Sequence, residues 1–356
     1  MTVAVVGLQR PQLPRFSGAI VGVIAVAAAA LIGLLAAWDV VAIAVVALVL
    51  FNVVLPLWSR VVEGRRAATN RLITGLVWSA VIVALAPLIW LLWEVVRNGA
   101  PAITWDFLSH AKTQHLDPKT YKLVGSTGVL HALIGTLFVT LGAAVISVPV
   151  GVMAAVYLVE YGNNGKRGVA KVLTLLVDVM TGIPSIVAGL FALALFSVFF
   201  GVGYRSGLAG SIALSLLMIP TVVRSTEEMM RLVPNDLREA SYALGVPKWR
   251  TIVKVVLPTS VGGIVTGVML AISRVIGETA PLLVAVGSID VVNTNLFSGR
   301  METLPDYIWT QYSEGATTPG SYEHAWGGAL LLILIVMILN LIARVIGKIF
   351  APKTGR

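Results

Sequence analysis

The chain has 356 residues, of which 57% are hydrophobic and only 12% are charged, whereas a soluble globular domain carries roughly 25% charged residues. This composition excludes a water-soluble fold, and the formal net charge of +9 does not indicate nucleic-acid binding, because the Lys and Arg residues lie in short segments between apolar runs. The chain has no cysteine, which excludes disulfides, thiolate metal ligands and cysteine nucleophiles. Its four histidines lack metal-ligand spacing, so no metal site is expected.

Eight apolar runs are long enough to cross a membrane, since a spanning helix needs about 20 residues. They cover approximately residues 18–37, 40–58, 72–93, 129–159, 173–200, 208–223, 255–286 and 326–343. The sequence therefore predicts an all-α polytopic protein embedded in the lipid bilayer of the plasma (inner) membrane.

The first two runs are separated only by Trp38 and Asp39. They form either a hairpin of two helices or a single re-entrant element. Arg10 and Arg15 ahead of the first run also fit a signal peptide, but this run is long and another follows directly, which favours a retained span.

The distribution of basic residues predicts the orientation of the chain. With the amino terminus in the cytoplasm and sides alternating through eight spans, the cytoplasmic segments collect nineteen of the 26 Lys and Arg residues. This asymmetry is the positive-inside pattern. We expect both termini in the cytoplasm, with one basic residue, Arg274, left inside a span.

The longest cytoplasmic loop, within residues 224–258, reads as two short helices around a turn at Gly245, where a glycine can adopt the left-handed conformation. On local physics alone it fits an amphipathic connector lying against the membrane. Within it, Glu239, Ala240, Ser241 and Gly245 are followed by Leu257 and Pro258. The spacing of these residues resembles the EAA loop of binding-protein-dependent ABC importer permeases.

The resemblance implies that this loop docks into a cleft on an ATPase subunit and passes its motion to the spans. Ser241 stands where the family usually has a second alanine, and its small side chain keeps a close approach possible. The chain has no phosphate-cradling loop of the G-x-x-x-x-G-K-[ST] type. We therefore expect it to bind no cofactor and to be non-catalytic, with ATP used by a separate subunit.

Two charges lie inside the seventh run, where Arg274 and Glu278 stand one helical turn apart among apolar residues. Charges at this depth are costly and usually face a polar cavity or a partner. The guanidinium of Arg274 can bind two oxygens of an oxyanion at once, which makes it a candidate substrate contact. The alternative is that Arg274 and Glu278 only neutralise each other.

Arg224, at the inner end of the sixth run, is a second candidate for a substrate contact, or else a positive-inside anchor. Asp178 is a weaker candidate that can pair with a basic residue elsewhere.

The segments RSTEEMMRLVP and SRVIGETAPLL, with the EAA loop between them, resemble the A-type permeases of the Pst phosphate-specific transport system over roughly residues 72–350. The resemblance implies a six-span permease core, with residues 1–71 as an N-terminal extension of two further spans. It also implies that Arg224 and Arg274 are translocation residues, with Glu278 beside the latter. The implied partners are a C-type permease in a heterodimer, two ATPase subunits and an extracytoplasmic phosphate-binding protein.

Three other interpretations remain. A permease of the same machinery for another oxyanion would use the same arginines. An ion-coupled secondary transporter or channel would use the intramembrane charges without an ATPase, and the EAA loop argues against it. A membrane enzyme would need a catalytic constellation, and the sequence shows none.

Overall fold

The computed structural model describes residues 12–112, 115–116, 123–124, 128–162, 167–314 and 320–350. The chain forms two compact units, Met1–Trp93 and Glu94–Arg356, which are described separately. The division into an extension of residues 1–71 and a core of 72–350 stays a prediction. The two termini lie outside the described residues, so their cytoplasmic location stays a prediction as well.

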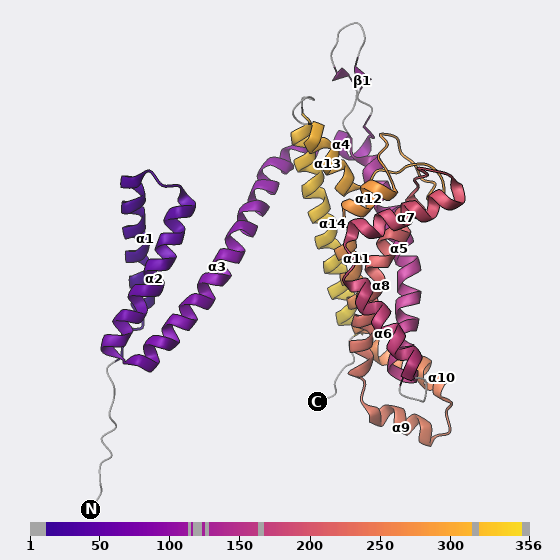
Figure 1. Cartoon of the computed structure of the whole chain (residues 1–356), viewed down its shortest axis with the longest axis horizontal. Helices are drawn as coiled ribbons and strands as arrows, with labels where there is room; N and C mark the ends of the chain where they lie inside the picture. The colour runs from indigo at the N-terminus through magenta and orange to yellow at the C-terminus, as the bar shows by residue number, and fades with distance from the viewer. Residues whose placement is uncertain are drawn as a thin grey trace, which may run out of the picture. The chain divides into compact units, whose positions relative to one another are not determined.

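The described part of the chain is mainly helical (Figure 1). Seven of its helices are long and apolar enough to cross a membrane, and a bent pair of shorter helices makes an eighth span if it is counted as one. The all-α polytopic fold predicted from the apolar runs is therefore confirmed.

The first unit contains α1 (Ser17–Ala36), α2 (Val40–Val62) and most of α3 (Arg65–Gly99). Helix α1 ends at Ala37, whose φ of 53° is left-handed and whose backbone N–H donates to Gly33. The chain therefore turns back at this point, and of the two forms predicted for the first pair of spans it adopts the helical hairpin.

Glu63 holds the junction between α2 and α3 together. Its carboxylate accepts two hydrogen bonds of 2.8 Å from the guanidinium of Arg71, one of 2.6 Å from Ser59 and one of 2.8 Å from the backbone N–H of Leu13. The hydrogen bonds from Arg71 are the main reason that the pKa of Glu63 falls to about 2.

The second unit is built on long helices that run between its two ends (Figure 1). They are α5 (Leu130–Val156), continued by the π-helical η2 (Tyr157–Tyr161), α8 (Gly207–Arg231), α11 (Leu257–Val275) and α14 (Ser321–Phe350). Helix α8 packs against both α5 and α11, and the core between them includes Leu214, Met218 and Val222. A methyl group on Gly151 of α5 would lie 2.7 Å from the Val222 side chain, so small residues let these helices approach closely.

Two predicted spans are interrupted in the structure. The run 173–200 is divided into α6 (Arg167–Thr181) and α7 (Ser185–Phe200), which meet at an angle of 107°. The run 255–286 is divided into α11, which ends at Val275, and the short α12 (Ala280–Ala285). Gly182 and Pro184 in one run, and Gly277 and Pro281 in the other, interrupt the helical hydrogen bonds.

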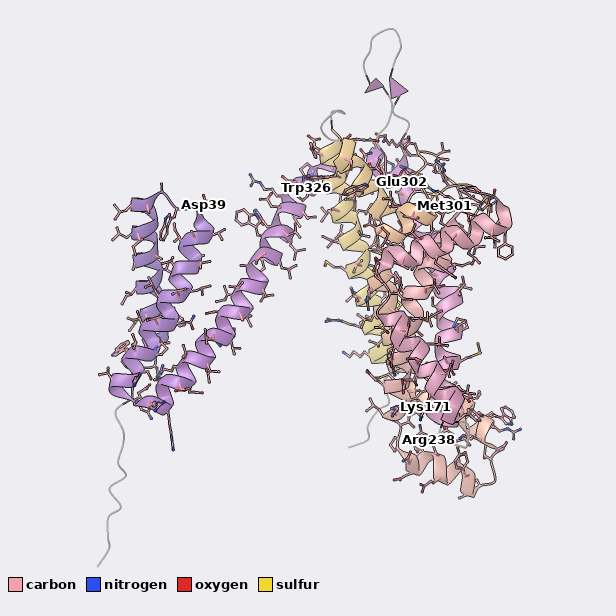
Figure 2. All side chains as sticks on the ribbon, viewed as in Figure 1. Asp39, Lys171, Arg238, Met301, Glu302 and Trp326 are labelled. Carbon is pink, nitrogen blue, oxygen red and sulfur yellow. The ribbon has the colours of Figure 1, made fainter. Side chains whose placement is uncertain are left out.

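The remaining elements cap the two ends of this unit. One end carries η1 (Ala100–Ala102), α4 (Trp105–Ser109), α13 (Leu304–Glu314) and the antiparallel pair β1 (His115–Leu116) and β2 (Leu123–Val124), in which His115 faces Val124. The other end carries α9 (Asn235–Ala243), α10 (Lys248–Thr251) and the π-helical η3 (Ile252–Val256). Figure 2 places Met301 and Glu302 at the first end, and Lys171 and Arg238 at the second.

Candidate translocation path and coupling loop

Arg274 and Glu278 line one polar pocket of about 220 Å³. Arg274 lies on the last turn of α11, and Glu278 lies in the non-helical segment between α11 and α12. The wall opposite comes from the break between α6 and α7 and from α8, namely Met180, Thr181, Ile183, Ser185, Leu217, Pro220 and Thr221. The two interrupted spans thus meet at the same pocket, as interrupted helices do around the binding sites of transporters.

The two charges of this pocket are not on consecutive turns of one helix. The backbone N–H of Glu278 donates to the carbonyl oxygen of Val275 over 3.1 Å and closes a turn. The prediction that Glu278 lies one turn after Arg274 on the same helix was therefore wrong. Within the part of the chain that the structure describes, no ion pair joins Arg274 to an acidic side chain. The geometry therefore favours a cation facing a polar cavity over a neutralised structural pair.

Close packing of α12 against α7 fixes the position of this pocket. A methyl group on Gly189 of α7 would lie 2.6 Å from Cα and 2.7 Å from the carbonyl oxygen of Pro281. Backbone therefore touches backbone here, and only glycine permits the contact.

Arg224 lies on α8 and is paired with acidic groups. Its guanidinium donates to Asp178 of α6, and to Glu227 of its own helix over 2.9 Å. Glu227 also accepts from Arg231 over 2.6 Å. The second predicted translocation residue therefore has a counter-ion on a neighbouring helix, which is the pairing that the sequence left open for Asp178.

The predicted coupling loop has the expected two helices and turn. Helix α9 carries Glu239, Ala240 and Ser241, and Gly245 follows it with a φ of 73°. Helix α10 comes next, and η3 then continues into α11, which begins with Leu257 and Pro258. The interpretation of two helices around a left-handed glycine is confirmed, whereas the coupling role of these residues stays a prediction.

Ser241 has a partner that alanine would lack. Its side chain is buried, and its hydroxyl lies 2.8 Å from the hydroxyl of Thr251 on α10. Glu239 and Ala240 on the same helix are not buried. Ser241 therefore joins the two helices of the loop, while its neighbours face outward.

The outer surface of the loop exposes apolar side chains. Leu244 is 83% exposed and Trp249 is 58% exposed, on either side of Gly245. Leu237 and Tyr242 of α9 are exposed as well. A cluster of exposed apolar groups in a charged loop is typical of a protein–protein contact.

A buried ion pair connects this loop to α5, which sequence reasoning missed. Arg238 of α9 donates to Glu160 of η2 over 3.0 Å, with side chains that are only 12% and 5% exposed. Arg238 also donates to the carbonyl of Met230, and Lys248 of α10 to that of Glu160. Glu160 and Arg238 stand 78 residues apart, and no local pattern links them, so only the tertiary structure shows this connection.

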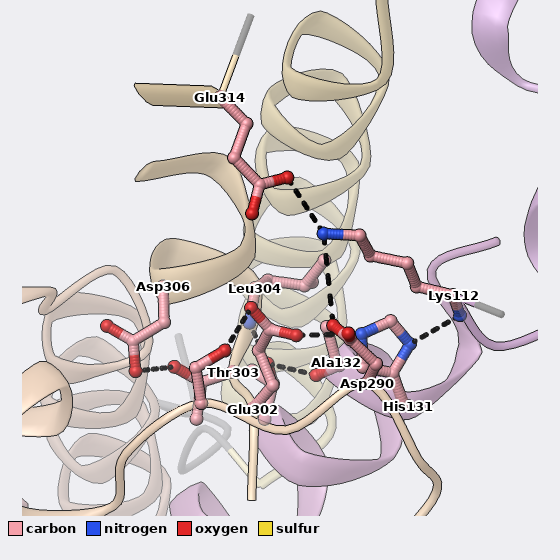
Figure 3. Close-up of polar contacts among 11 residues, drawn as sticks. Lys112, His131, Ala132, Asp290, Glu302, Thr303, Leu304, Asp306 and Glu314 are labelled. Carbon is pink, nitrogen blue, oxygen red and sulfur yellow. Dashed lines mark hydrogen bonds and ion pairs between the residues drawn. The ribbon is translucent and has the colours of Figure 1, made fainter. Parts of the chain in front are cut away.

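A second buried polar network lies at the opposite end of the unit (Figure 3). The Nε2 of His131 lies 2.8 Å from the carboxylate of Glu302, with both side chains 1% exposed, and Ser288 donates to the other oxygen of that carboxylate over 3.0 Å. The ammonium of Lys112 lies 3.9 Å from Asp290 and 2.8 Å from Glu314. The network ties the segment after α12 to the start of α5.

Ligand atoms of His131, Asp290 and Glu302 lie within 4.8 Å of one another, although the sequence showed no metal-ligand spacing. The backbone N–H of Lys112 donates to Nδ1 of His131 over 3.4 Å, so Nε2 carries the proton that is shared with Glu302. With Nδ1 accepting, Nε2 donating and the Lys112 cation next to Asp290, the protein's own donors and charge satisfy this cluster. We interpret it as a structural network.

The interrupted helices around a polar pocket, with a folded loop at one end of the unit, have the arrangement that the sequence motifs led us to expect for the membrane-embedded permease of an ABC importer. A model of the family described as "Binding-protein-dependent transport system inner membrane component" matches residues 147–356. The fold is similar to that of a chain in the crystal structure of a bacterial alginate ABC transporter, with a TM-score of 0.54 and 13% sequence identity, covering 78% of this chain and 96% of that one.

Proteins similar in sequence to this chain identify a subgroup within these permeases. The phosphate transport system permease protein PstA 1 of Mycobacterium tuberculosis is 46% identical over 287 residues, covering 79% of this chain and 90% of the relative. PstA of Yersinia pestis is 39% identical over 291 residues, covering 81% of this chain and 92% of the relative. The chain therefore belongs to the binding-protein-dependent inner membrane permeases and, within them, to the PstA group, which confirms the resemblance seen in its motifs.

Proposed function

We propose that this chain is the A-type permease subunit of an ATP-driven importer and that it carries inorganic phosphate into the cell. The geometric observation that carries this proposal is Arg274, a guanidinium that faces a polar pocket at the meeting point of two interrupted spans and forms no ion pair within the described residues. A guanidinium matches the oxygens of a tetrahedral oxyanion with paired donors and stays charged at every physiological pH. The PstA relatives support phosphate as the anion.

The proposed assembly contains a C-type permease, two copies of a cytoplasmic ATPase subunit and an extracytoplasmic phosphate-binding protein. The permease binds no cofactor, and ATP is bound and hydrolysed by the ATPase subunits. Both chain termini and the α9–α10 loop face the cytoplasm, where the basic residues gather. In this arrangement residues 1–71 are an extension to the core of residues 72–350.

In the mechanism we propose, ATP binding closes the ATPase subunits and moves the exposed surface around Glu239, Ala240 and Leu244. The buried pair between Arg238 and Glu160 carries this motion to α5, and the direct continuation of α10 through η3 carries it to α11. Because Arg274 lies at the far end of α11, movement of that helix changes which side of the membrane the pocket faces. The chain thus supplies the path and the coupling.

The test is ATP-dependent uptake of labelled phosphate by proteoliposomes that contain the complete complex, with matched amounts of assembled protein. Arg274→Gln should abolish uptake, and Arg274→Lys should retain only a part of it, because an ammonium cannot bind two oxygens in the guanidinium geometry. Arg97→Gln, the same change on α3, is the control. Normal uptake by an intact Arg274→Gln complex would reject the proposed path.

Substrate competition separates the other interpretations. Inhibition of labelled phosphate uptake by unlabelled phosphate, but not by sulfate or molybdate, supports a phosphate permease. Stronger inhibition by sulfate or molybdate than by phosphate supports a permease for another oxyanion. Uptake driven by an ion gradient in the absence of ATP would instead support a secondary transporter.

A further inference from the structure

The Asp178–Arg224 pair joins α6 to α8 next to the pocket, on the side of the coupling loop. Thr181 of α6 and Thr221 of α8 line the pocket. Asp178 and Arg224 lie three residues beyond them on the same two helices, which is about one helical turn. On both helices this step leads toward the end of the unit that carries α9 (Figure 1).

The Asp178 carboxylate differs from the other acidic partner of Arg224. Glu227 lies on the same helix and is shared with Arg231, so it stays with Arg224 when α8 moves. Asp178 comes from α6, and its contact with Arg224 depends on the distance between the two helices. The Arg224 side chain is 38% exposed and that of Asp178 is 59% exposed, so an anion can reach the guanidinium.

We propose that Asp178 is a resident counter-anion that the transported oxyanion replaces on Arg224, and that this exchange opens the inner end of the path. The inference rests on the proposed function and deepens it. A carboxylate and an oxyanion offer the same type of acceptor to a guanidinium, so they compete for the same donors. When the anion is absent, Asp178 neutralises Arg224 and joins α6 to α8.

The exchange also supplies a direction for the motion. An anion bound to Arg224 stands next to the released Asp178 carboxylate, and the two negative charges repel each other. The repulsion separates α6 from α8 at the end of the pocket nearest the coupling loop. Asp178 thus acts as a gating residue through Arg224, and it does not itself bind the substrate.

The test measures binding of labelled inorganic phosphate to the purified, nucleotide-free complex. Asp178→Asn keeps the shape of the side chain and removes its charge. The variant should bind phosphate about fivefold more tightly than the native complex, which is the factor that a partly exposed ion pair is worth. The double variant Asp178→Asn with Arg224→Gln should lose this gain, because the gain requires the guanidinium.

The control is Asp39→Asn, which makes the same change in net charge at an exposed residue of the first unit and should leave binding unchanged. Unchanged or weaker binding by an intact Asp178→Asn complex would overturn the proposal, because a purely structural ion pair does not compete with an anion. A gain that persists in the double variant would overturn it as well. A gain for sulfate or molybdate but not for phosphate would retain the exchange and reject phosphate as the substrate.

Discussion

The hydroxyl groups of Ser241 and Thr251 lie 2.8 Å apart and join α9 to α10 across the Gly245 turn. The relationship shows how one small buried side chain sets the shape of the proposed ATPase-docking surface, since Leu244 and Trp249 project from the two sides of the turn that the hydrogen bond holds together.

Ser241 should tolerate loss of its hydroxyl but not an increase in size. Ser241→Ala removes one hydrogen bond, which is worth about 1 kcal/mol, so the ATPase subunit should still co-purify with the permease and uptake should be largely retained. Ser241→Leu adds volume at a buried position, which costs about 1–3 kcal/mol, and should separate α9 from α10. Co-purification of the ATPase subunit and phosphate uptake measure both variants. Equal behaviour of the two would show that the contact does not shape the docking surface.

Breaking the buried pair of Arg238 and Glu160 should uncouple the loop from α5. Arg238→Gln leaves the buried Glu160 carboxylate without its cation, a change that costs about 3–5 kcal/mol. We expect a lower thermal stability of the complex and ATP hydrolysis that no longer drives uptake. The ratio of phosphate transported to ATP hydrolysed is the measurement.

The double variant of Arg238→Gln and Glu160→Gln provides the control for this pair. It removes both charges, so it should recover a large part of the stability that the single variant loses. If the two substitutions were simply additive in stability, the pair would not be energetically coupled.

Gly245 should be intolerant of a side chain for conformational reasons alone. Its φ of 73° is left-handed, and a methyl group added to its Cα would have no atom within 4 Å. Gly245→Ala should therefore cost about 1–2 kcal/mol in backbone strain and reduce ATP-dependent uptake. Gly168→Ala on α6 is the matched control, because that glycine also has open space around it and lies within a helix. Equal uptake by the two variants would show that the turn is not required.

Asp306 should make the stability of its end of the fold depend on pH. Burial, with a smaller contribution from the charge of Glu302, raises the pKa of Asp306 from 3.8 to about 7. The folded state thus holds this proton more tightly than the unfolded state does. The stabilisation is complete below about pH 4 and is lost as the pH rises through about 7.

We expect the Tm of the complex to fall by a few degrees between pH 5 and pH 8 because of this group. Asp306→Asn keeps a neutral side chain at every pH and should reduce that fall. The comparison uses the difference between the two Tm profiles, because other groups titrate equally in both proteins. Parallel profiles would contradict the assignment of the raised pKa to Asp306.

The sequence by itself determined the class of fold and the residues of the candidate path. The lengths of the apolar runs predict the spans, and the turn-forming residues around Gly245 predict the loop. Both depend on residues that are close together in the chain. Arg274 was found for a similar reason, since a charge in an apolar run needs no knowledge of its neighbours to be noticed. Arg224, at the end of its run, was found through the resemblance of its motif to the family.

The tertiary structure alone decided which groups meet. It brought the interruptions of two spans to one pocket. It also paired Asp178 with Arg224 and Glu160 with Arg238, across 46 and 78 residues of sequence. Hydropathy does not predict such contacts, because it measures the preference of a segment for lipid. The pairing of charges depends on how helices pack side by side, and that packing is set by side-chain shapes contributed from distant parts of the chain.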